Sequence, residues 1–150
     1  KLCKKHDINV KAYLLLKPPF LTEKEALLDA RDSIVKARKA GADRVSVNPL
    51  NVQRGTLVER LWQRGEYRPP WLWTVVEVLK WADENMDIPV LSHPTAAGKR
   101  RGTHNCVSCN GEVYKGIMAY STTRDPRHLE LDCKCKDLWK DVLELEGLQH

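Results

Sequence analysis

Three short apolar runs alternate with helical patterns through the first 95 residues, and this alternation constrains the fold more than any other feature of the chain. The runs at 10–16, 44–47 and 88–91 have the length and composition of strands. The segments 22–40 and 69–80 repeat apolar residues at the spacing of an amphipathic helix. This βαβαβ order predicts parallel strands joined by right-handed crossovers, as in a doubly wound sheet or part of a barrel. We therefore predict an α/β fold.

Local signals mark the ends of these elements. Thr22 and Glu25 have the spacing of a capping box, and Gly41 ends the helix that follows them. The two prolines at 69–70 suit the start of the next long helix, and 56–63 is predicted as a further short helix. The first apolar run contains few polar residues, which favours a strand that is buried on both faces.

Polar residues follow all three predicted strands. Lys17, Asn48 and the pair at 92–93, a serine and a histidine, stand where parallel α/β proteins bind ligands. Each of them could instead cap a turn. The segment 51–56 opens the short helix, so its amides and side chains could hold a carboxylate or phosphate, or form a loop with ordinary caps.

The strongest chemical signal is a C-x2-C and C-x-C array formed by Cys106, Cys109, Cys133 and Cys135. Four thiolates suit tetrahedral zinc, and the same set can ligate an iron–sulfur cluster. Two disulfides or free buried thiols are the alternatives. The chain shows no secretory signal peptide and Cys3 stands alone upstream, which disfavours disulfides. We predict a metal site, zinc ahead of iron–sulfur, in a cytoplasmic protein.

The charge balance points to an anionic partner, although charge alone is not specific. The 150 residues carry a net charge of +5 and the sequence pI is near 9.0. Basic residues surround the cysteines, at 99–101 before the array, at 134 within it and at 136 directly after it, and could offset the negative thiolate centre. No apolar run is long enough to cross a bilayer, so we expect no membrane contact.

Several longer stretches are specific enough to indicate a family. They are "VKAYLLLKPPFLTEKEA", "NPLNVQRGTLVERLWQRGEYRPPWLW", "GKRRGTHNC" and "LDCKCKDLWK". Their combination resembles the carboxyl-terminal half of the archaeosine-biosynthesis radical SAM proteins, over nearly the whole chain. The resemblance implies the last three strands and helices of a partial (β/α)6, TIM-like barrel at 1–97. A small cysteine-rich metal-binding tail would follow at 98–150.

The resemblance also implies an activity. In that family S-adenosylmethionine binds across the strand ends beside a [4Fe-4S] cluster, and its reductive cleavage yields a deoxyadenosyl radical. A transglycosylase-like partner subunit first attaches lysine to a deazaguanine base in tRNA. The radical step then cleaves the lysine adduct and leaves the amidine of archaeosine, so the implied protein is a lyase of tRNA modification.

The chain departs from the family pattern in one respect. The C-x3-C-x2-C motif that binds the radical cluster is absent, and Cys3 is the sole cysteine before Cys106. We therefore expect the cluster ligands to lie outside this chain, the chain alone to be inactive, and the sheet to have an exposed edge. A non-catalytic zinc-stabilised module that binds RNA or protein is the alternative, as is another radical SAM enzyme such as the Elongator catalytic subunit.

The resemblance carries over to four candidate cofactor-binding residues. Radical SAM proteins hold the ribose and methionyl groups of the cofactor with polar residues after the fourth and fifth strands, which match Lys17 and Asn48. Ser46 and Gln53 are the next candidates. Ser46 qualifies because its two valine neighbours would face away from the barrel interior.

Basic residues are the candidate contacts to tRNA. Phosphate contacts position an RNA without reading its sequence, and arginine and lysine supply them. Trp71 and Trp73 lie in an apolar helical pattern, so we expect them in the core and not against a base. The candidate nucleic-acid-binding residues are Lys99, Arg100, Arg101 and Arg54.

Overall fold

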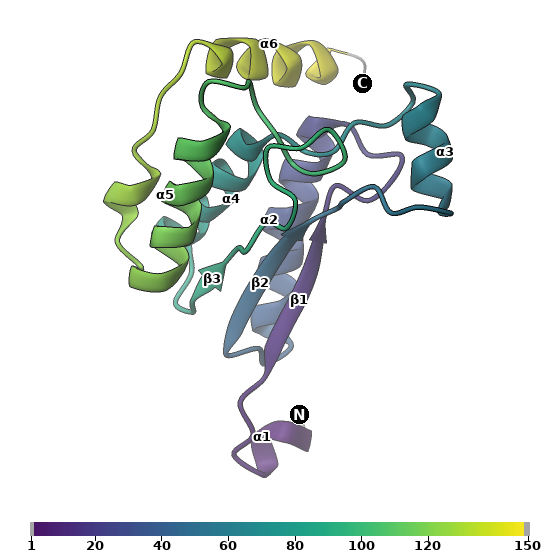
Figure 1. The fold of residues 1–150 in the computed structure, drawn as a ribbon. Coiled ribbons are helices and arrows are strands. Elements are labelled where there is room, and N and C mark those ends of the chain that lie inside the picture. Colours follow the sequence, from purple (N-terminus) through teal and green to yellow (C-terminus); the bar gives the residue numbers. More distant parts are fainter. Residues whose placement is uncertain (1, 149–150) are drawn as a thin grey trace.

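A parallel sheet of three strands in the order β1-β2-β3 forms the centre of the fold (Figure 1). The structure, a computed structural model, describes residues 2–148. Tyr13 on β1 pairs with Ser46 on β2, which in turn pairs with Leu91 on β3. The predicted α/β class and parallel strands are confirmed. The strands are β1 (Lys11–Leu16), β2 (Arg44–Pro49) and β3 (Val90–Leu91).

Helices connect the strands and continue beyond them. The first crossover contains α2, and the second contains α3 and α4, as the periodicity predicts. No helix within the described residues is both long and apolar enough to cross a membrane. The helices are α1 (Leu2–Lys5), α2 (Glu23–Lys39), α3 (Leu57–Gln63), α4 (Leu72–Asn85), α5 (Asn110–Thr123), the 3-10 helix η1 (Pro126–Leu129) and α6 (Cys135–Gly147).

The predicted capping box starts α2. The Glu25 N–H donates to Thr22 Oγ1 over 3.2 Å, and the Thr22 N–H donates to Glu25 Oε2 over 2.8 Å. Gly41 adopts a φ of 104°, a left-handed conformation that ends the helix and suits glycine. The fourth helix begins at Leu72 and not at the prolines, and its N-cap Trp71 has no side-chain cap.

One face of the sheet forms the main core. Leu16, Val45 and Val90 are fully buried against α2 and α4, which pack on each other and on the strands. Burial of such side chains contributes about 1.5–3 kcal/mol each. Figure 1 shows α2 behind β1 and β2. The sheet is therefore anchored by its helices on that face.

The opposite face of the sheet is open at β1, which corrects one prediction. Tyr13 and Leu15 are 68% and 49% exposed, so the first strand is not buried on both faces. The physical reason is its position. β1 is an edge strand that pairs with β2 alone in the described chain, and its outward side chains have no covering helix. The expected exposed sheet edge is present.

Residues of the predicted tail share this core. Val113, Ile117 and Trp139 belong to the same hydrophobic cluster as the strands. Helix α5 packs on α4 and β3, in the place of the helix of a third β/α unit. Ser121 Oγ accepts the Ser92 N–H over 3.0 Å and donates to the Ser92 carbonyl over 2.7 Å. The described part of the predicted tail, 98–148, is thus joined to the sheet by packing and hydrogen bonds.

A second, smaller cluster holds α3. Val52, Leu61 and Tyr67 are buried together beside the carboxyl end of β1 and β2. The Tyr67 hydroxyl donates to the Lys17 carbonyl over 2.9 Å. Thr56 caps α3 by accepting the Glu59 N–H over 3.2 Å. These contacts fix α3 near the strand ends.

Candidate metal centre and strand-end residues

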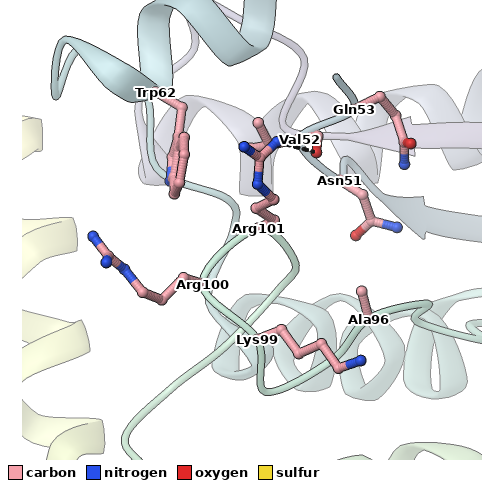
Figure 2. A pocket seen from close by; sticks show the side chains of 8 residues that line it. All are labelled: Asn51, Val52, Gln53, Trp62, Ala96, Lys99, Arg100 and Arg101. Carbon is pink, nitrogen blue, oxygen red and sulfur yellow. Dashed lines mark hydrogen bonds between the residues drawn. The ribbon is translucent and has the colours of Figure 1, made fainter.

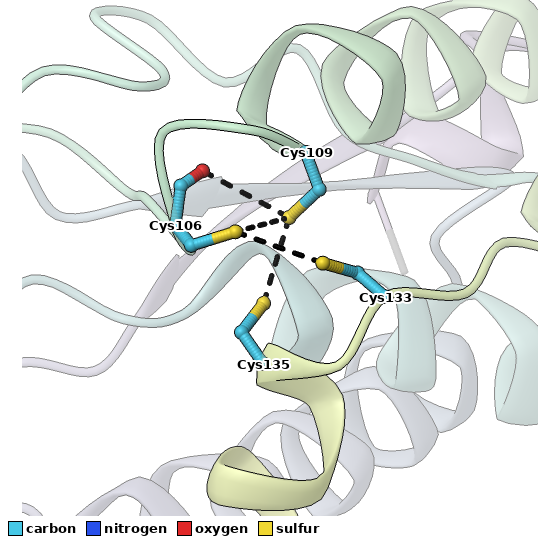
Figure 3. Close-up of side chains that lie close together, drawn as sticks. All are labelled: Cys106, Cys109, Cys133 and Cys135. Carbon is cyan, nitrogen blue, oxygen red and sulfur yellow. Dashed lines mark hydrogen bonds between the residues drawn. The ribbon is translucent and has the colours of Figure 1, made fainter.

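The four predicted ligands meet in one cluster. Cys106 Sγ lies 3.5 Å from Cys109 Sγ and 3.6 Å from Cys133 Sγ, and Cys109 Sγ lies 3.5 Å from Cys135 Sγ (Figure 3). All four sulfurs are within 4.8 Å of one another. We refer to these four residues as the cysteine cluster. The sequence prediction that the two cysteine pairs converge is confirmed.

The spacing of the sulfurs fits a tetrahedral thiolate site. Zinc–sulfur bonds of about 2.3 Å in a tetrahedron place the sulfurs about 3.8 Å apart. The distances in the cluster are close to this value and much longer than the roughly 2.05 Å of a disulfide bond. All of these cysteines are free, and so is the exposed Cys3. The cluster therefore has the donor set and the shape of a metal site.

Two helix N-termini favour thiolates in the cluster. Cys109 is the N-cap of α5, and Cys135 is the first residue of α6. The positive end of a helix dipole stabilises a nearby anion. The Trp73 indole N–H donates to Cys135 Sγ over 3.3 Å, and this bond connects the cluster to α4. Such outer contacts orient metal ligands.

The thiols differ in their electrostatic surroundings. The Ser108 hydroxyl lies 3.0 Å from Cys106 Sγ and lowers the pKa of that thiol to about 6. Burial raises the pKa of Cys109 and of Cys135. Buried thiolates need a compensating positive charge, which a divalent ion bound by the cluster would supply.

The basic residues near the cysteines have different surroundings. Lys136 Nζ donates to the Leu131 carbonyl over 3.2 Å and lies 5.2 Å from the Trp73 ring centroid. Arg101 forms a 2.7 Å ion pair with Glu59 on α3. That pair directs the Arg101 charge toward α3 and not toward the thiolates, contrary to one use suggested by the sequence.

Lys17 ends β1 in a buried ion pair. Its Nζ lies 2.7 Å from Glu23 Oε2, and the two side chains are 9% and 1% exposed. Glu23 Oε1 also accepts the Trp71 N–H over 2.8 Å and the Thr74 hydroxyl. Lys17 thus has a partner inside the chain, while an ammonium group keeps further hydrogens to donate. Sequence reasoning missed Glu23, because an acidic residue in a first helical turn normally reads as a simple dipole contact.

Ser46 and Asn48 lie together on the face of β2 away from the main core, where Ser46 is buried and Asn48 is half-buried. The Ser46 hydroxyl donates to Asn48 Oδ1 over 3.3 Å. Val45 and Val47 are buried in the core, as the sequence predicted when it placed Ser46 on the other face. Ser92, by contrast, is fully buried and donates to the Val47 carbonyl over 2.7 Å, which is a structural contact between β2 and β3.

A cleft of about 500 Å³ opens beside the strand ends (Figure 2). It lies between α3 and the loop after β3, and we call it the basic cleft. It brings together Gln53 and three of the predicted basic residues, whereas Arg54 is not among its lining residues. Sequence reasoning missed Trp62, whose only local signal is its place in a short helix. The lining residues are Asn51, Val52, Gln53, Trp62, Ala96, Lys99, Arg100 and Arg101.

Two named relatives match nearly the whole chain. Archaeosine synthase subunit beta of Methanosarcina acetivorans is 48% identical over 149 residues, which is 98% of this chain. The protein of the same name from Thermococcus kodakarensis is 46% identical over 143 residues, or 93% of this chain. The chain is a homologue of archaeosine synthase subunit beta. The resemblance drawn from the sequence motifs is thereby confirmed, while no family model matches the chain.

The homology to archaeosine synthase subunit beta covers part of those proteins. The chain spans 43% and 44% of the length of the two named relatives. An uncharacterised protein of Methanocaldococcus jannaschii is 35% identical over 150 residues, and the chain spans 41% of it. The matched region is thus less than half of each relative.

A solved structure supports the fold. Elp3 of Methanocaldococcus infernus, with an N-terminal deletion, matches 79% of this chain and 28% of its own with a TM-score of 0.51. The 19% sequence identity makes this a likeness of fold alone. Because the archaeosine synthase relatives are 46–48% identical, the Elongator alternative is not favoured.

Proposed function

We propose that this chain is the carboxyl-terminal part of a radical SAM enzyme that converts a lysine adduct of a deazaguanine base in tRNA to archaeosine. The observation that carries the proposal is the 48% identity to archaeosine synthase subunit beta over 98% of the chain. Identity at this level over such a length supports a common role for the matched region. The subunit name also supports a partner, which we propose to be the transglycosylase-like subunit.

The uncovered face of the sheet supports the proposal that these three strands form part of a barrel. The three strands are parallel and are covered by helices on one face, as in the outer layer of a (β/α) barrel. We propose that residues 1–97 form the last three strands and helices of a partial (β/α)6 barrel. The segment 98–150 would add the metal-binding tail and the helix that packs beside β3.

We propose that Asn48 and Ser46 contact S-adenosylmethionine, with Lys17 and Gln53 as further contacts. With Oδ1 engaged by Ser46, the amide nitrogen of Asn48 is the group that would donate to a ribose hydroxyl or a carboxylate. S-adenosylmethionine, with a [4Fe-4S] cluster held by ligands outside this chain, would supply the radical chemistry. In the natural-length protein, Asn48→Ala should weaken S-adenosylmethionine binding, and Asn85→Ala, at the far end of α4, should not. Equal affinities for both variants would remove Asn48 from the site.

For the cysteine cluster we propose a structural zinc ion. Four closed thiolate ligands leave no open position for a substrate, which is typical of structural zinc. Metal analysis and an absorption spectrum of anaerobically purified protein distinguish the two metals. Zinc without a charge-transfer band is expected, and iron with sulfide would instead establish a second iron–sulfur cluster.

The decisive experiment reconstitutes the reaction. The natural-length protein, its partner subunit, a reductant and S-adenosylmethionine are incubated with tRNA that carries the lysine adduct, and the nucleosides are analysed by mass spectrometry. Archaeosine should form only when S-adenosylmethionine is present. If the adduct persists in an active preparation that cleaves S-adenosylmethionine, the reaction assignment is wrong. Retained tRNA binding without cofactor cleavage would favour the non-catalytic binding module.

A further inference from the structure

The basic cleft contains two cations that lack an anionic partner. In the described residues, no hydrogen bond or ion pair engages the Lys99 ammonium or the Arg100 guanidinium, and both side chains are exposed. Arg101 differs, because Glu59 neutralises it over 2.7 Å. The cleft therefore presents two uncompensated positive charges to solvent, and these charges would attract an anionic ligand.

An aromatic wall stands beside these cations. The Arg101 guanidinium lies 4.7 Å from the centroid of the Trp62 ring, and that of Arg100 lies 5.8 Å away. Arg101, which is paired with Glu59, lies over the half-buried indole on α3. Figure 2 shows Trp62 at one side of the cleft. A tryptophan ring near cations suits a ligand that combines a flat base with a phosphate.

The far wall of the cleft offers hydrogen-bonding groups. Figure 2 shows Asn51 and Gln53 across the cleft from Trp62. Asn51 Nδ2 donates to Thr95 Oγ1, whereas the buried Asn51 Oδ1 has no partner in the described residues. That oxygen is inaccessible to solvent, so a ligand in the cleft does not reach it in this conformation. Gln53 is exposed, and its amide can hydrogen-bond to the edge of a base.

Backbone hydrogen bonds and a tight turn shape the loop that carries the cations. The Val52 N–H donates to the Arg101 carbonyl over 2.8 Å, and the Gly98 N–H donates to the Thr103 carbonyl over 2.8 Å. A side chain at Gly102 would lie 2.1 Å from the Ala96 carbonyl oxygen, so only glycine fits that turn. The cleft is thus preformed, which lowers the cost of ordering it around a ligand.

We propose that the basic cleft binds one unpaired nucleotide of the RNA substrate. The base stacks on Trp62, its edge meets the exposed amide of Gln53, and the adjoining phosphates pair with Lys99 and Arg100. This inference rests on the proposed function, which makes tRNA the substrate, and it adds the residue that contacts a base and the mode of contact.

The proposal is tested by measuring the affinity for fluorescein-labelled, unmodified tRNA, and the salt dependence of that affinity, in variants of the natural-length protein. Trp62→Leu should weaken binding about 5- to 100-fold and leave the salt dependence unchanged, because stacking releases no counterions. Trp62→Phe, which keeps an aromatic face, should recover most of the affinity. Lys99→Ala with Arg100→Ala should weaken binding and reduce the slope of log affinity against log salt by about 1 to 2.

Matched controls separate the cleft from general charge. Lys39→Ala with Arg44→Ala removes two exposed cations at the opposite end of the strands and should change the slope much less. Metal content and thermal melting establish that each variant is folded. The proposal is overturned if Trp62→Leu binds tRNA like the wild type, or if the two double variants behave alike.

The same variants distinguish this proposal from the proposed function. S-adenosylmethionine binding, measured in parallel by equilibrium dialysis, should be unchanged by Trp62→Leu; its loss with intact tRNA binding would make the cleft a cofactor site and overturn the proposal. If the wild type forms archaeosine and Trp62→Leu binds tRNA normally, the proposal for the basic cleft is wrong while the proposed reaction stands. If tRNA binding depends on the cleft but no archaeosine forms, the proposed reaction is wrong while the proposal for the basic cleft stands.

Discussion

A hydrogen bond from an indole N–H, added to the packing of the cysteines themselves, joins the cysteine cluster to the core. Trp73 is 1% exposed on α4, and its Nε1 donates to Cys135 Sγ over 3.3 Å. A hydrogen bond of this kind orients the thiolate and offsets part of its charge. The indole therefore has two roles, one in packing and one beside the metal site.

Trp73→Phe isolates the second role. Phenylalanine keeps an apolar ring in the core but removes the donor to Cys135, so zinc affinity should fall about 10- to 100-fold. Competition with a chromophoric chelator measures the affinity. Trp81→Phe, a partly buried position on the same helix, should leave it unchanged. Equal affinity in both variants would show that the bond to Cys135 does not support the metal.

The buried pair of Lys17 and Glu23 predicts a large effect on stability. Glu23→Gln leaves the Lys17 ammonium buried without a counter-ion, so the free energy of unfolding should fall by about 3–5 kcal/mol. Asp32→Asn breaks the pair with Lys36, whose side chain is 73% exposed, and should lower the free energy of unfolding far less, because solvent screens that pair. Urea unfolding measures both. Similar losses in the two variants would contradict the importance of burial.

At the scale of elements, α6 depends on the contacts at its ends. The Trp139 indole N–H donates to Thr74 Oγ1 over 2.9 Å, and Glu146 Oε2 accepts the Lys24 N–H over 3.0 Å. A helix of 13 residues is marginal by itself in water. Its first residue is Cys135, so metal binding and helix docking are coupled.

Removal of the metal should release α6 before the sheet unfolds. Hydrogen exchange after chelation is expected to show lost protection in α6 and retained protection in β2 and α2, because α6 buries Trp139 alone whereas β2 and α2 each bury several side chains. Cys135→Ser should reproduce this pattern, and Cys3→Ser, which is exposed and outside the cluster, should not. Retained protection of α6 without metal would rule out the coupling.

Local sequence patterns predicted where the helices, strands and metal ligands lie better than they predicted the tertiary contacts of those elements. The capping box at Thr22 and the spacing of the cysteines depend on residues close in sequence or on matched ligand pairs, so both could be read directly. Besides Lys17, the partners of Glu23 are Trp71 and Thr74, which lie 48 and 51 residues away, and no local pattern reveals them. The exposed face of β1 was missed for the same reason, since an apolar run does not show what covers it.

At the scale of the whole molecule, the functional candidates gather at one end. The carboxyl ends of β1 and β2, helix α3 and helix α6 lie at the same end of the fold (Figure 1). Hydrogen bonds also join the segment between α3 and α4 to the loop between β3 and α5: Arg68 Nη2 donates to the His104 carbonyl over 2.9 Å, and the Thr103 hydroxyl donates to the Pro70 carbonyl over 2.8 Å. A ligand at the strand ends would therefore contact several elements at once.

The open side of the sheet predicts self-association of this 150-residue chain. β1 has an unpaired edge, and Tyr13 and Leu15 expose apolar surface next to it, a combination that favours pairing with a second copy. Sedimentation velocity should show oligomers that increase with concentration. Tyr13→Lys with Leu15→Lys should shift the chain toward monomer, because close positive charges oppose edge-to-edge pairing.

Leu28→Lys with Leu57→Lys provides the control for that change. These leucines are 54% and 55% exposed on α2 and α3, away from the edge, so their replacement alters charge and surface apolarity without affecting β1. The control should still associate. If instead the wild type stays monomeric at every concentration, or both double variants dissociate equally, the edge of β1 is not the contact. Hydrogen exchange at β1 would then be compared between this chain and the natural-length protein. Slower exchange in the natural-length protein would show that the edge of β1 is covered there, and equal exchange would show that the edge stays open without associating.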